Sequence, residues 1–398
     1  MKNIFFHVDV NSAYLSWEAA YRRYYLGDRK DLRFQKAAVG GDIAKRHGII
    51  LAKSMAAGAC GVRTGDSILE ARRKCPELMI VPPDYELYER SSAMLVKLLK
   101  QYSPRVEQYS IDEAFMEMTG TENLWGPPEK AAAALKDRIR EELGFTVNIG
   151  ISENRLLAKM AGDFKKPDLV HTLFFREVPQ KMWPLPVEKL FFVGRAAGGK
   201  LRSLGIHTIG ELAAADPELL RSHLKKQGEW IQDFANGKDC SPVLEPPVKQ
   251  AGYGNSTTTA EDVTDPEAAG RVLLYLSEKV GARLRADGAK AAVVSVSIRD
   301  QNFRNISRQR TLKRETDITG EIYQISRGIF EQMWDGRPLR HLGIHTAAGS
   351  EEGGWQLELF PGEEEKKRRM DQTVDCIRRR FGPDALVRAS LMSRAGGR

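Results

Sequence analysis

The segment VEQYSIDEAFMEM, residues 106–118, constrains the fold of this chain most strongly. Its apolar residues suit a buried strand, but Asp112 and Glu113 interrupt it, and a buried charge is costly unless it is paired or bound to a metal. Neighbouring side chains in a flat strand point to opposite faces. Both carboxylates can therefore face one site only if the backbone bends there, which predicts the tip of a hairpin.

A third acid, Asp9, ends another short apolar run, NIFFHVDV. A carboxylate cluster in a cleft would bind hard divalent cations, and Mg²⁺ prefers one or two carboxylates together with substrate phosphates. Two such ions can hold the attacking and leaving oxygens of a phosphoryl transfer. The residues alone leave a second interpretation open, in which Asp112 and Glu113 belong to a solvated turn and Asp9 lies elsewhere.

Composition narrows the class of protein. With 398 residues, the chain is too long for one typical core, so we expect two to four domains. Its four scattered cysteines form no CxxC pair, which argues against structural zinc or disulfides and favours a cytoplasmic location. No apolar run is long enough to span a membrane, and Asp9 and Asn11 stand where a signal peptide would stay apolar. The formal net charge of +8 is compatible with nucleic-acid binding but does not require it.

The predicted elements change in character along the chain. Strands and helices alternate in residues 1–12 and 81–173, as is typical of an α/β layer. Short helices and glycine turns follow from about residue 174, and the proline-rich segment 238–250 predicts a linker. Beyond it we expect two strands and two helices, at 291–300, 307–316, 265–285 and 319–334.

Two motifs carry a family resemblance. HVDVNSAY (7–14) and YSIDEAF (109–115) closely resemble, in order and spacing, the catalytic motifs of Y-family DNA polymerases, the translesion enzymes of the bacterial DNA polymerase IV type. GGD (40–42), CGVRTG (60–65) and KKP (165–167) agree with the same family. The resemblance covers nearly the whole chain and implies a multidomain α/β and α+β fold, the right-hand polymerase. The implied domains are a palm (1–12 and 81–173), fingers (13–80), a helical thumb with helix-hairpin-helix elements (174–237), a linker (238–250), a little finger (251–348) and a charged tail (349–398).

The resemblance also implies an activity. The chain would be a DNA-directed DNA polymerase that adds deoxynucleoside triphosphates to the 3′ end of a primed DNA template, with low fidelity and bypass of damage. Asp9, Asp112 and Glu113 would be the catalytic residues and would coordinate two Mg²⁺ ions, with the backbone carbonyl of Val10 as a further ligand. One ion would activate the primer hydroxyl and the other would hold the triphosphate. Ser110 would support the hairpin.

Further residues are implied for the nucleotide pocket. Tyr14 stands where the family has an aromatic ring under the sugar, which excludes a 2′-hydroxyl by collision. Lys166, in KKP, would reach the triphosphate. Asn11 stands where an acid is common in the family, and Ala13 is small where a second aromatic is often found. A core tyrosine and a surface lysine remain the alternative interpretations of the first two residues.

The fingers depart from the family pattern. Many members have a tyrosine and an arginine that bind the phosphates, but alignment on GVRTG places Met55 and Gly58 at these positions. Lys53, or Arg46 before it, could supply the missing cation. A solvated lysine with no role in binding is the open alternative.

Two regions are expected to hold DNA. Residues 187–216 resemble the helix-hairpin-helix of a polymerase thumb, in which backbone N–H groups near Gly194, helped by Lys200, would approach a phosphate. Phe192 replaces a common glycine there. Residues 299–314 are strongly basic, and alternating side chains on paired strands would form one stripe along the DNA backbone, although a solvated basic face is also possible. The residues expected to bind DNA in this stripe are Arg299, Arg304, Arg308 and Arg310.

The segment QLELF (356–360) resembles the peptide by which bacterial polymerases bind the sliding clamp. Its expected anchors are Gln356, Leu357, Leu359 and Phe360. We expect a monomer without membrane contact, and two rival functions remain. A non-catalytic or weakly active adaptor in a bypass complex would explain Met55 and Gly58, and a nucleotidyl cyclase with a related palm would leave the basic region and QLELF without a purpose.

Overall fold

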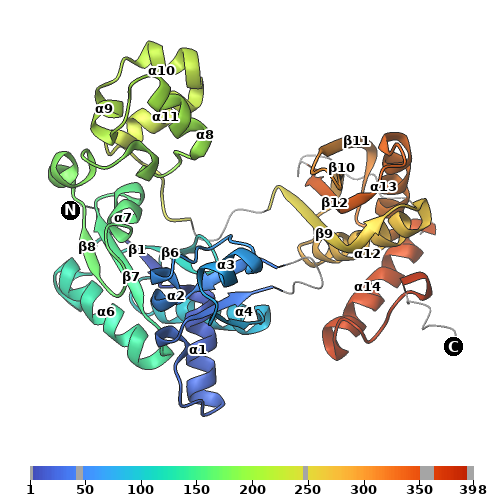
Figure 1. Ribbon diagram of the computed structural model, residues 1–398, viewed down its shortest axis with the longest axis horizontal. Coiled ribbons are helices and arrows are strands. Elements are labelled where there is room, and N and C mark those ends of the chain that lie inside the picture. Colours follow the sequence, from blue (N-terminus) through green and yellow to red (C-terminus); the bar gives the residue numbers. More distant parts are fainter. Residues whose placement is uncertain (1–2, 42–47, 245–249, 350–362, 392–398) are drawn as a thin grey trace. The chain divides into compact units, whose positions relative to one another are not determined.

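The computed structural model describes residues 3–41, 48–244, 250–349 and 363–391. These residues form two compact units, which divide near residue 248 (Figure 1). In the described part of the chain, no helix is both long and apolar enough to cross a bilayer.

A five-stranded sheet with the order β5-β6-β1-β7-β8 forms the centre of the first unit. Its strands are β1 (Phe5–Val10), β5 (Val106–Gln108), β6 (Glu113–Glu117), β7 (Val147–Ser152) and β8 (Val170–Thr172). Neighbours are antiparallel except β7 and β8, which are parallel. β5 and β6 form the hairpin predicted for residues 106–118, with Asp112 in the connecting turn.

Helices cover both faces of this sheet, so β1 is buried along its whole length. Phe6 and Val8 pack into the larger core together with residues of three helices and with the short helix α5 nearby. These elements are α1 (Ala13–Tyr25), α4 (Tyr85–Leu99), α6 (Pro128–Leu143) and α5 (Glu122–Trp125). On the other face, Phe5 contacts Phe115 and Ala158 of helix α7 (Arg155–Gly162). Because side chains alternate along a strand, Asp9 points to this α7 face.

A smaller sheet lies within the residues expected to form the fingers. Its strand order is β3-β2-β4, and it has a separate core with Ile50, Val62 and Ile68. The elements are β2 (Ala37–Gly40), β3 (Ile50–Lys53), β4 (Met79–Val81), α2 (Met55–Ala59), α3 (Ile68–Lys74) and a 3₁₀ turn (Leu32–Phe34).

Helices make up the rest of the first unit, and they share a core with α7. They are α8 (Arg195–Ser203), α9 (Ile209–Ala214), α10 (Pro217–Leu224) and α11 (Lys226–Ala235), with shorter turns at Phe175–Glu177, Val178–Met182 and Val187–Lys189. The predicted linker begins as a packed segment, because Val243 contacts Phe5 and Phe115, and the N–H of Leu244 donates to Glu107.

The second unit is a four-stranded antiparallel sheet with the order β11-β10-β12-β9. Its strands are β9 (Gly252–Val263), β10 (Ala291–Asp300), β11 (Asn305–Thr316) and β12 (Leu339–Ala348). Helices α12 (Pro266–Ala286) and α13 (Thr319–Met333) supply the other half of its core. The predicted strands and helices of this region are confirmed, and β9 and β12 are additional. Part of the predicted tail is helix α14 (Glu363–Phe381), followed by a 3₁₀ turn (Ala389–Leu391), and both pack on α12.

Candidate active site

The three predicted carboxylates come together at the hairpin. Asp9 of β1 and Glu113 of β6 are directly opposite in the register, so their side chains share a face. Asp112 precedes Glu113, and its carbonyl accepts a 3.0 Å hydrogen bond from the N–H of Val10. The hydroxyl of Ser110 donates to the Asp112 carboxylate at 2.7 Å, as expected of a residue that supports the turn. Two segments a hundred residues apart therefore build one acidic site.

Lys166 is the cation beside Asp9. Its ammonium forms ion pairs with Asp9 and, at 2.8 Å, with Asp163. Burial is the largest influence on Asp9 and raises its pKa, although the charge of Lys166 opposes the effect. Burial also disfavours the charged form of Lys166, but Asp9 and Asp163 outweigh it, and the pKa of Lys166 is raised. Lys166 therefore stays charged at the site, as its predicted role requires.

Glu113 has its own cation, Lys159. The ammonium donates to both carboxylate oxygens, at 2.7 and 2.8 Å, and Nε2 of His7 lies 3.8 Å from one of them. Burial raises the pKa of Glu113, but the neighbouring His7 and Lys159 outweigh it and lower the pKa to about 2. Glu113 is thus ionised at neutral pH, and both of its oxygens have a partner.

Sequence reasoning missed Lys159 and His7. Every residue of α7 is buried, including Arg155 and Lys159. The Lys159 ammonium also lies 5.4 Å from the ring centre of Tyr109 and 5.1 Å from that of Phe191, so it sits where the hairpin meets the following helical region. The sequence did contain a signal for Lys159, because a charged residue on an apolar helix surface needs a buried partner.

The donor atoms suit a hard cation. The carboxylates of Asp9, Asp112 and Glu113 and the carbonyl of Val10 are all oxygen donors, which Mg²⁺ and similar ions prefer. In the described residues, no three acidic, histidine or cysteine side chains are placed so that they could hold an ion as they stand. The lysines beside Asp9 and Glu113 show instead that each of these carboxylates binds positive charge.

Tyr14 lies next to the carboxylates. It is half-buried in the first turn of α1 and stacks on Tyr88, with 4.8 Å between ring centres. Burial raises the pKa of Tyr14, and the negative charge of Asp112 raises it further. Its ring is therefore held rigidly by Tyr88 with one edge near the acidic site.

Asn11 has a structural role in this chain. Its side-chain oxygen accepts hydrogen bonds from the hydroxyl of Thr146 at 3.0 Å and the N–H of Asp168 at 2.9 Å, and its amide donates to Asn148 at 3.1 Å. These bonds tie the end of β1 to β7 and to the segment after Lys166. An amide can donate and accept at once, which a carboxylate in its place could not.

Lys53 occupies the place of a side chain at Gly58. A Cβ atom on Gly58 would lie 2.8 Å from Nζ of Lys53, so the ammonium lies directly over the glycine. Lys53 is half-buried at the end of β3, whereas Met55 is 66% exposed. Arg46, the other candidate cation, lies outside the described residues.

The region expected to form the thumb hairpin is open at its glycine. Gly194 precedes α8, and among the described residues no atom beyond its chain neighbours lies within 4 Å of where its Cβ would be. Lys200 is exposed on the same helix. Phe192, which replaces a common glycine, has φ of +69°, in the left-handed region that favours glycine. The backbone at Phe192 therefore has a conformation that favours glycine, although the sequence has phenylalanine there.

The arginines of the second unit do not form the single stripe that we expected. Arg308 and Arg310 lie opposite two buried valines of β10, so they point to the side that the helices cover. Arg308 accordingly donates to the carbonyl of Gln332 on α13 at 3.3 Å. Arg299 points to the other side, and Arg304 lies exposed in the turn before β11. Arg308 and Arg310 therefore lie on one side of the edge strand β11, whereas Arg299 belongs to the neighbouring strand β10.

The predicted clamp peptide, with Gln356, Leu357, Leu359 and Phe360, lies outside the described residues.

The sequence matches known families along most of its length. The impB/mucB/samB family matches residues 8–163, the C-terminal domain of that family matches 251–359, and the IMS family HHH motif matches 176–206. DNA polymerase IV of Clostridium acetobutylicum is 40% identical over 399 aligned residues, which cover 99% of each chain. DNA polymerase IV of Acetivibrio thermocellus is 37% identical and covers 100% of this chain and 99% of its own.

The fold agrees with these matches. A solved chimeric Y-family DNA polymerase superposes with a TM-score of 0.73 at 20% identity, covering 86% of this chain and 98% of its own. VDVNSAY (8–14) and YSIDEAF (109–115) lie inside the matched region 8–163. The chain belongs to the impB/mucB/samB family, the Y-family DNA polymerases.

Proposed function

We infer that this chain is a template-directed DNA polymerase that extends a primer with deoxynucleotides and copies damaged templates with low fidelity. One observation carries the inference most directly: Asp9 and Glu113 are opposite each other on adjacent strands, with Asp112 in the adjoining turn. A non-catalytic adaptor would need no such site, and the match to DNA polymerase IV along the whole chain leaves no feature that favours a cyclase.

Y-family DNA polymerases are metal-dependent. We propose that Asp9, Asp112, Glu113 and the carbonyl of Val10 would hold two Mg²⁺ ions, which when bound lower the pKa of a primer hydroxyl and neutralise the reacting phosphates. The residues around them prepare this site. Lys159 and His7 keep Glu113 ionised, and the Ser110 hydroxyl holds one oxygen of Asp112.

The same site would select and bind the nucleotide. Lys166 carries a charge that burial does not remove, so it can neutralise a triphosphate close to Asp9. Lys53, over Gly58, would supply the cation that the fingers otherwise lack. The Tyr14 ring, fixed by Tyr88, would lie under the sugar and exclude ribonucleotides. Replacing Tyr14 with alanine should raise ribonucleotide incorporation at least about tenfold, and unchanged sugar selectivity would refute this role.

DNA would be held through its phosphates. Gly194 and Lys200 would approach the backbone from the hairpin region, and Arg299, Arg304, Arg308 and Arg310 would do so from the edge at β11. We further propose a cytoplasmic monomer that binds a sliding clamp through the peptide at 356–360.

Primer extension on a primed template with Mg²⁺ tests the catalytic assignment. The wild-type chain should extend the primer and Asp112→Ala should not. Asp137→Ala removes a carboxylate from the surface of α6 and should extend as the wild type does. Circular dichroism confirms that each variant is folded. Extension by both wild type and Asp112→Ala, or by neither, would contradict the assignment.

A further inference from the structure

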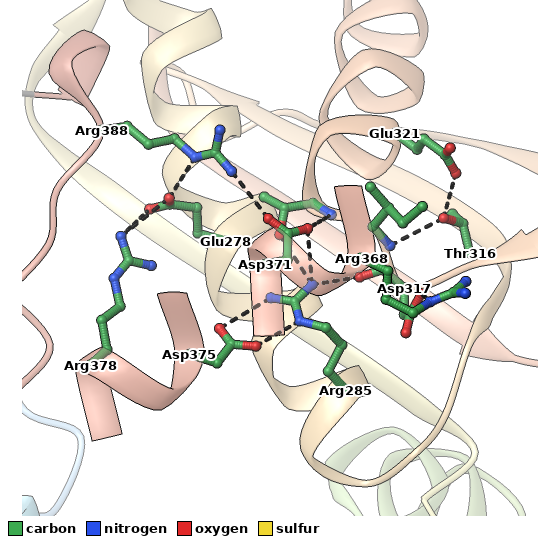
Figure 2. Close-up of polar contacts among 12 residues, drawn as sticks. Glu278, Arg285, Thr316, Asp317, Glu321, Arg368, Asp371, Asp375, Arg378 and Arg388 are labelled. Atoms are coloured by element: carbon green, nitrogen blue, oxygen red, sulfur yellow. Dashed lines mark hydrogen bonds and ion pairs between the residues drawn. The ribbon is translucent and has the colours of Figure 1, made fainter. Parts of the chain in front are cut away.

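Helix α14 packs on the second unit without burying any of its apolar residues. Its sequence is EEEKKRRMDQTVDCIRRRF, and its one buried residue is a carboxylate, Asp371, which is 3% exposed. Surface helices normally dock through an apolar stripe. Figure 2 shows that charged side chains make this contact instead. The matched C-terminal domain of the family ends at residue 359, so α14 lies beyond it.

Arg285 of α12 is the centre of the contact. Its guanidinium is 5% exposed, and it binds both oxygens of Asp375, at 2.6 and 3.2 Å (Figure 2). It also lies 3.4 Å from Asp371. A Cβ atom on Gly281, one turn earlier, would come within 3.0 Å of the guanidinium, so the glycine makes room for it. A buried arginine that forks onto a carboxylate is a strong and specific contact.

Asp371 caps a helix that begins 52 residues earlier. Helix α13 has Ile318 at its N-cap position, and isoleucine has no side-chain acceptor for the first N–H groups. Asp371 supplies one, because its carboxylate accepts a 2.8 Å hydrogen bond from the N–H of Thr319. A carboxylate at this end also interacts favourably with the helix dipole. α14 thus completes the start of α13.

The same helix holds the end of β11. Arg368 donates to Asp317, the residue after the strand, at 2.8 Å, and Glu364 pairs with Arg314 of the strand at 2.9 Å. The Asp317 carbonyl in turn accepts a 2.6 Å hydrogen bond from Arg285. The corner where β11 passes into α13 is therefore held by three positions of α14 and by α12.

The second half of α14 makes a further buried contact. Glu278 of α12 is 7% exposed and accepts hydrogen bonds from Arg378 at 3.2 Å and from Arg388 at 2.8 Å (Figure 2). Arg388 also lies 3.4 Å from Asp371. Removing one partner from such a network leaves the others without their counter-charges, which is costly.

We propose that α14 braces the corner between β11 and α13, and that Asp371 and Arg285 are positioning residues for the edge strand that carries Arg308 and Arg310. α13 packs directly on β11, so the position of its first turn affects the strand. The brace stands on the contacts above, and only its consequence for DNA rests on the proposed function.

Hydrogen exchange of the full chain tests the brace. Asp371→Ala removes both the cap and the charge, whereas Asp371→Asn keeps an oxygen that can cap and removes only the charge. Asp384→Ala, at an exposed aspartate after α14, is the matched control. We expect amide exchange in 319–322 and 312–316 to rise at least about fivefold in Asp371→Ala, which equals the ~1 kcal/mol of a typical lost cap.

The variants should separate the two contributions. In Asp371→Asn the rise should be smaller at 319–322 than in Asp371→Ala, while exchange in α14 increases in both. Peptides from β1 and β7 of the first unit, and all peptides of Asp384→Ala, should stay within twofold of wild type. Rates at 319–322 and 312–316 that stay within twofold in both Asp371 variants would overturn the brace.

DNA binding tests the positioning role. Asp371→Ala and Arg285→Met should weaken binding of primed DNA at least threefold, and nucleotide addition at saturating DNA should keep its wild-type rate. Faster exchange with unchanged affinity, while Arg308→Ala does weaken binding, would overturn this role. If the wild type fails to bind or extend primed DNA, the proposed function fails, and the exchange result still decides the brace.

Discussion

Replacement of Lys159 by methionine should destabilise the first unit, because the Lys159 ammonium donates to both carboxylate oxygens of Glu113. Methionine keeps much of the volume of lysine, so the change is mainly one of charge. The side chains of Lys159 and Glu113 are 9% and 20% exposed, and loss of one partner from such a pair leaves a buried charge. This typically costs about 3–5 kcal/mol.

The pKa of Glu113 gives an independent magnitude. A pKa of about 2 in the folded chain against an ordinary 4.5 corresponds to about 3 kcal/mol in favour of folding. Because the folded pKa is the lower one, this stability is fully present above pH 4.5 and is lost as the pH falls towards 2. Lys159 shares this effect with His7, so Lys159→Met should cost up to about 3 kcal/mol at pH 7, and the difference from wild type should shrink in acid.

Hydrogen exchange at increasing urea, read on peptides from β1 and β6, measures this free energy locally. Adding Glu113→Gln to Lys159→Met should restore at least about 1 kcal/mol, since no charge is then left alone. Lys181→Met is the matched control, because Lys181 pairs with Glu177 at the same 2.7 Å but is 41% exposed, and it should cost under about 1 kcal/mol. A cost below about 1 kcal/mol for Lys159→Met, or a double variant as unstable as the single one, would show that Lys159 does not compensate the charge of Glu113.

Three further outcomes are expected. Lys53→Ala should raise the KM for the incoming nucleotide about tenfold in steady-state primer extension, because it removes a charge-assisted contact. Lys36→Ala nearby should leave the KM unchanged. An unchanged KM for Lys53→Ala would show that Lys53 is only a solvated lysine. Phe192→Gly should be more stable than Phe192→Ala by about 1 kcal/mol in urea unfolding, since φ is +69°; the reverse order would contradict the strain. Arg308→Ala and Arg310→Ala should each lower the slope of log affinity against log salt by about 1 in DNA-binding titrations, and an unchanged slope would remove these residues from the contact.

Much of the fold could be predicted from local patterns. The strand predicted at 291–300 and the helix predicted at 319–334 agree with β10 and α13 because each pattern lies within one element. β9 and β12 were not predicted, because their partly exposed faces carry glycine, threonine and histidine, which give no alternating apolar signal. Their position is decided by pairing with distant strands, which a local pattern does not contain.

The residues of the site could likewise be predicted only in part. Asp9, Asp112 and Glu113 could be predicted because their motifs are specific, and the register of β1 with β6 then brings them together. Lys159 could not be placed, since its contact with Glu113 depends on how α7 packs across the sheet. The prediction of a single stripe of arginines was wrong for a related reason. The side of the sheet to which each β11 side chain points is set by the register of β11 with β10.

Which residue pairs with a given charged side chain is the feature that is least predictable from sequence. α14 is highly charged, and no pattern in its sequence reveals that Asp371 caps α13. Gly281 and Arg285 are likewise ordinary helix residues until α14 is placed beside them.

The most direct test of the central claim is the single-turnover rate of one templated nucleotide addition. Asp112→Asn and Glu113→Gln remove one charge each with little change in shape. Glu117→Gln does the same further along β6, where Glu117 has the same 20% exposure as Glu113 and pairs with Arg105. We expect addition of the complementary nucleotide by the wild type, a loss of at least about 100-fold for Asp112→Asn and Glu113→Gln, and a wild-type rate for Glu117→Gln. Rates for Asp112→Asn and Glu113→Gln within tenfold of wild type would contradict it.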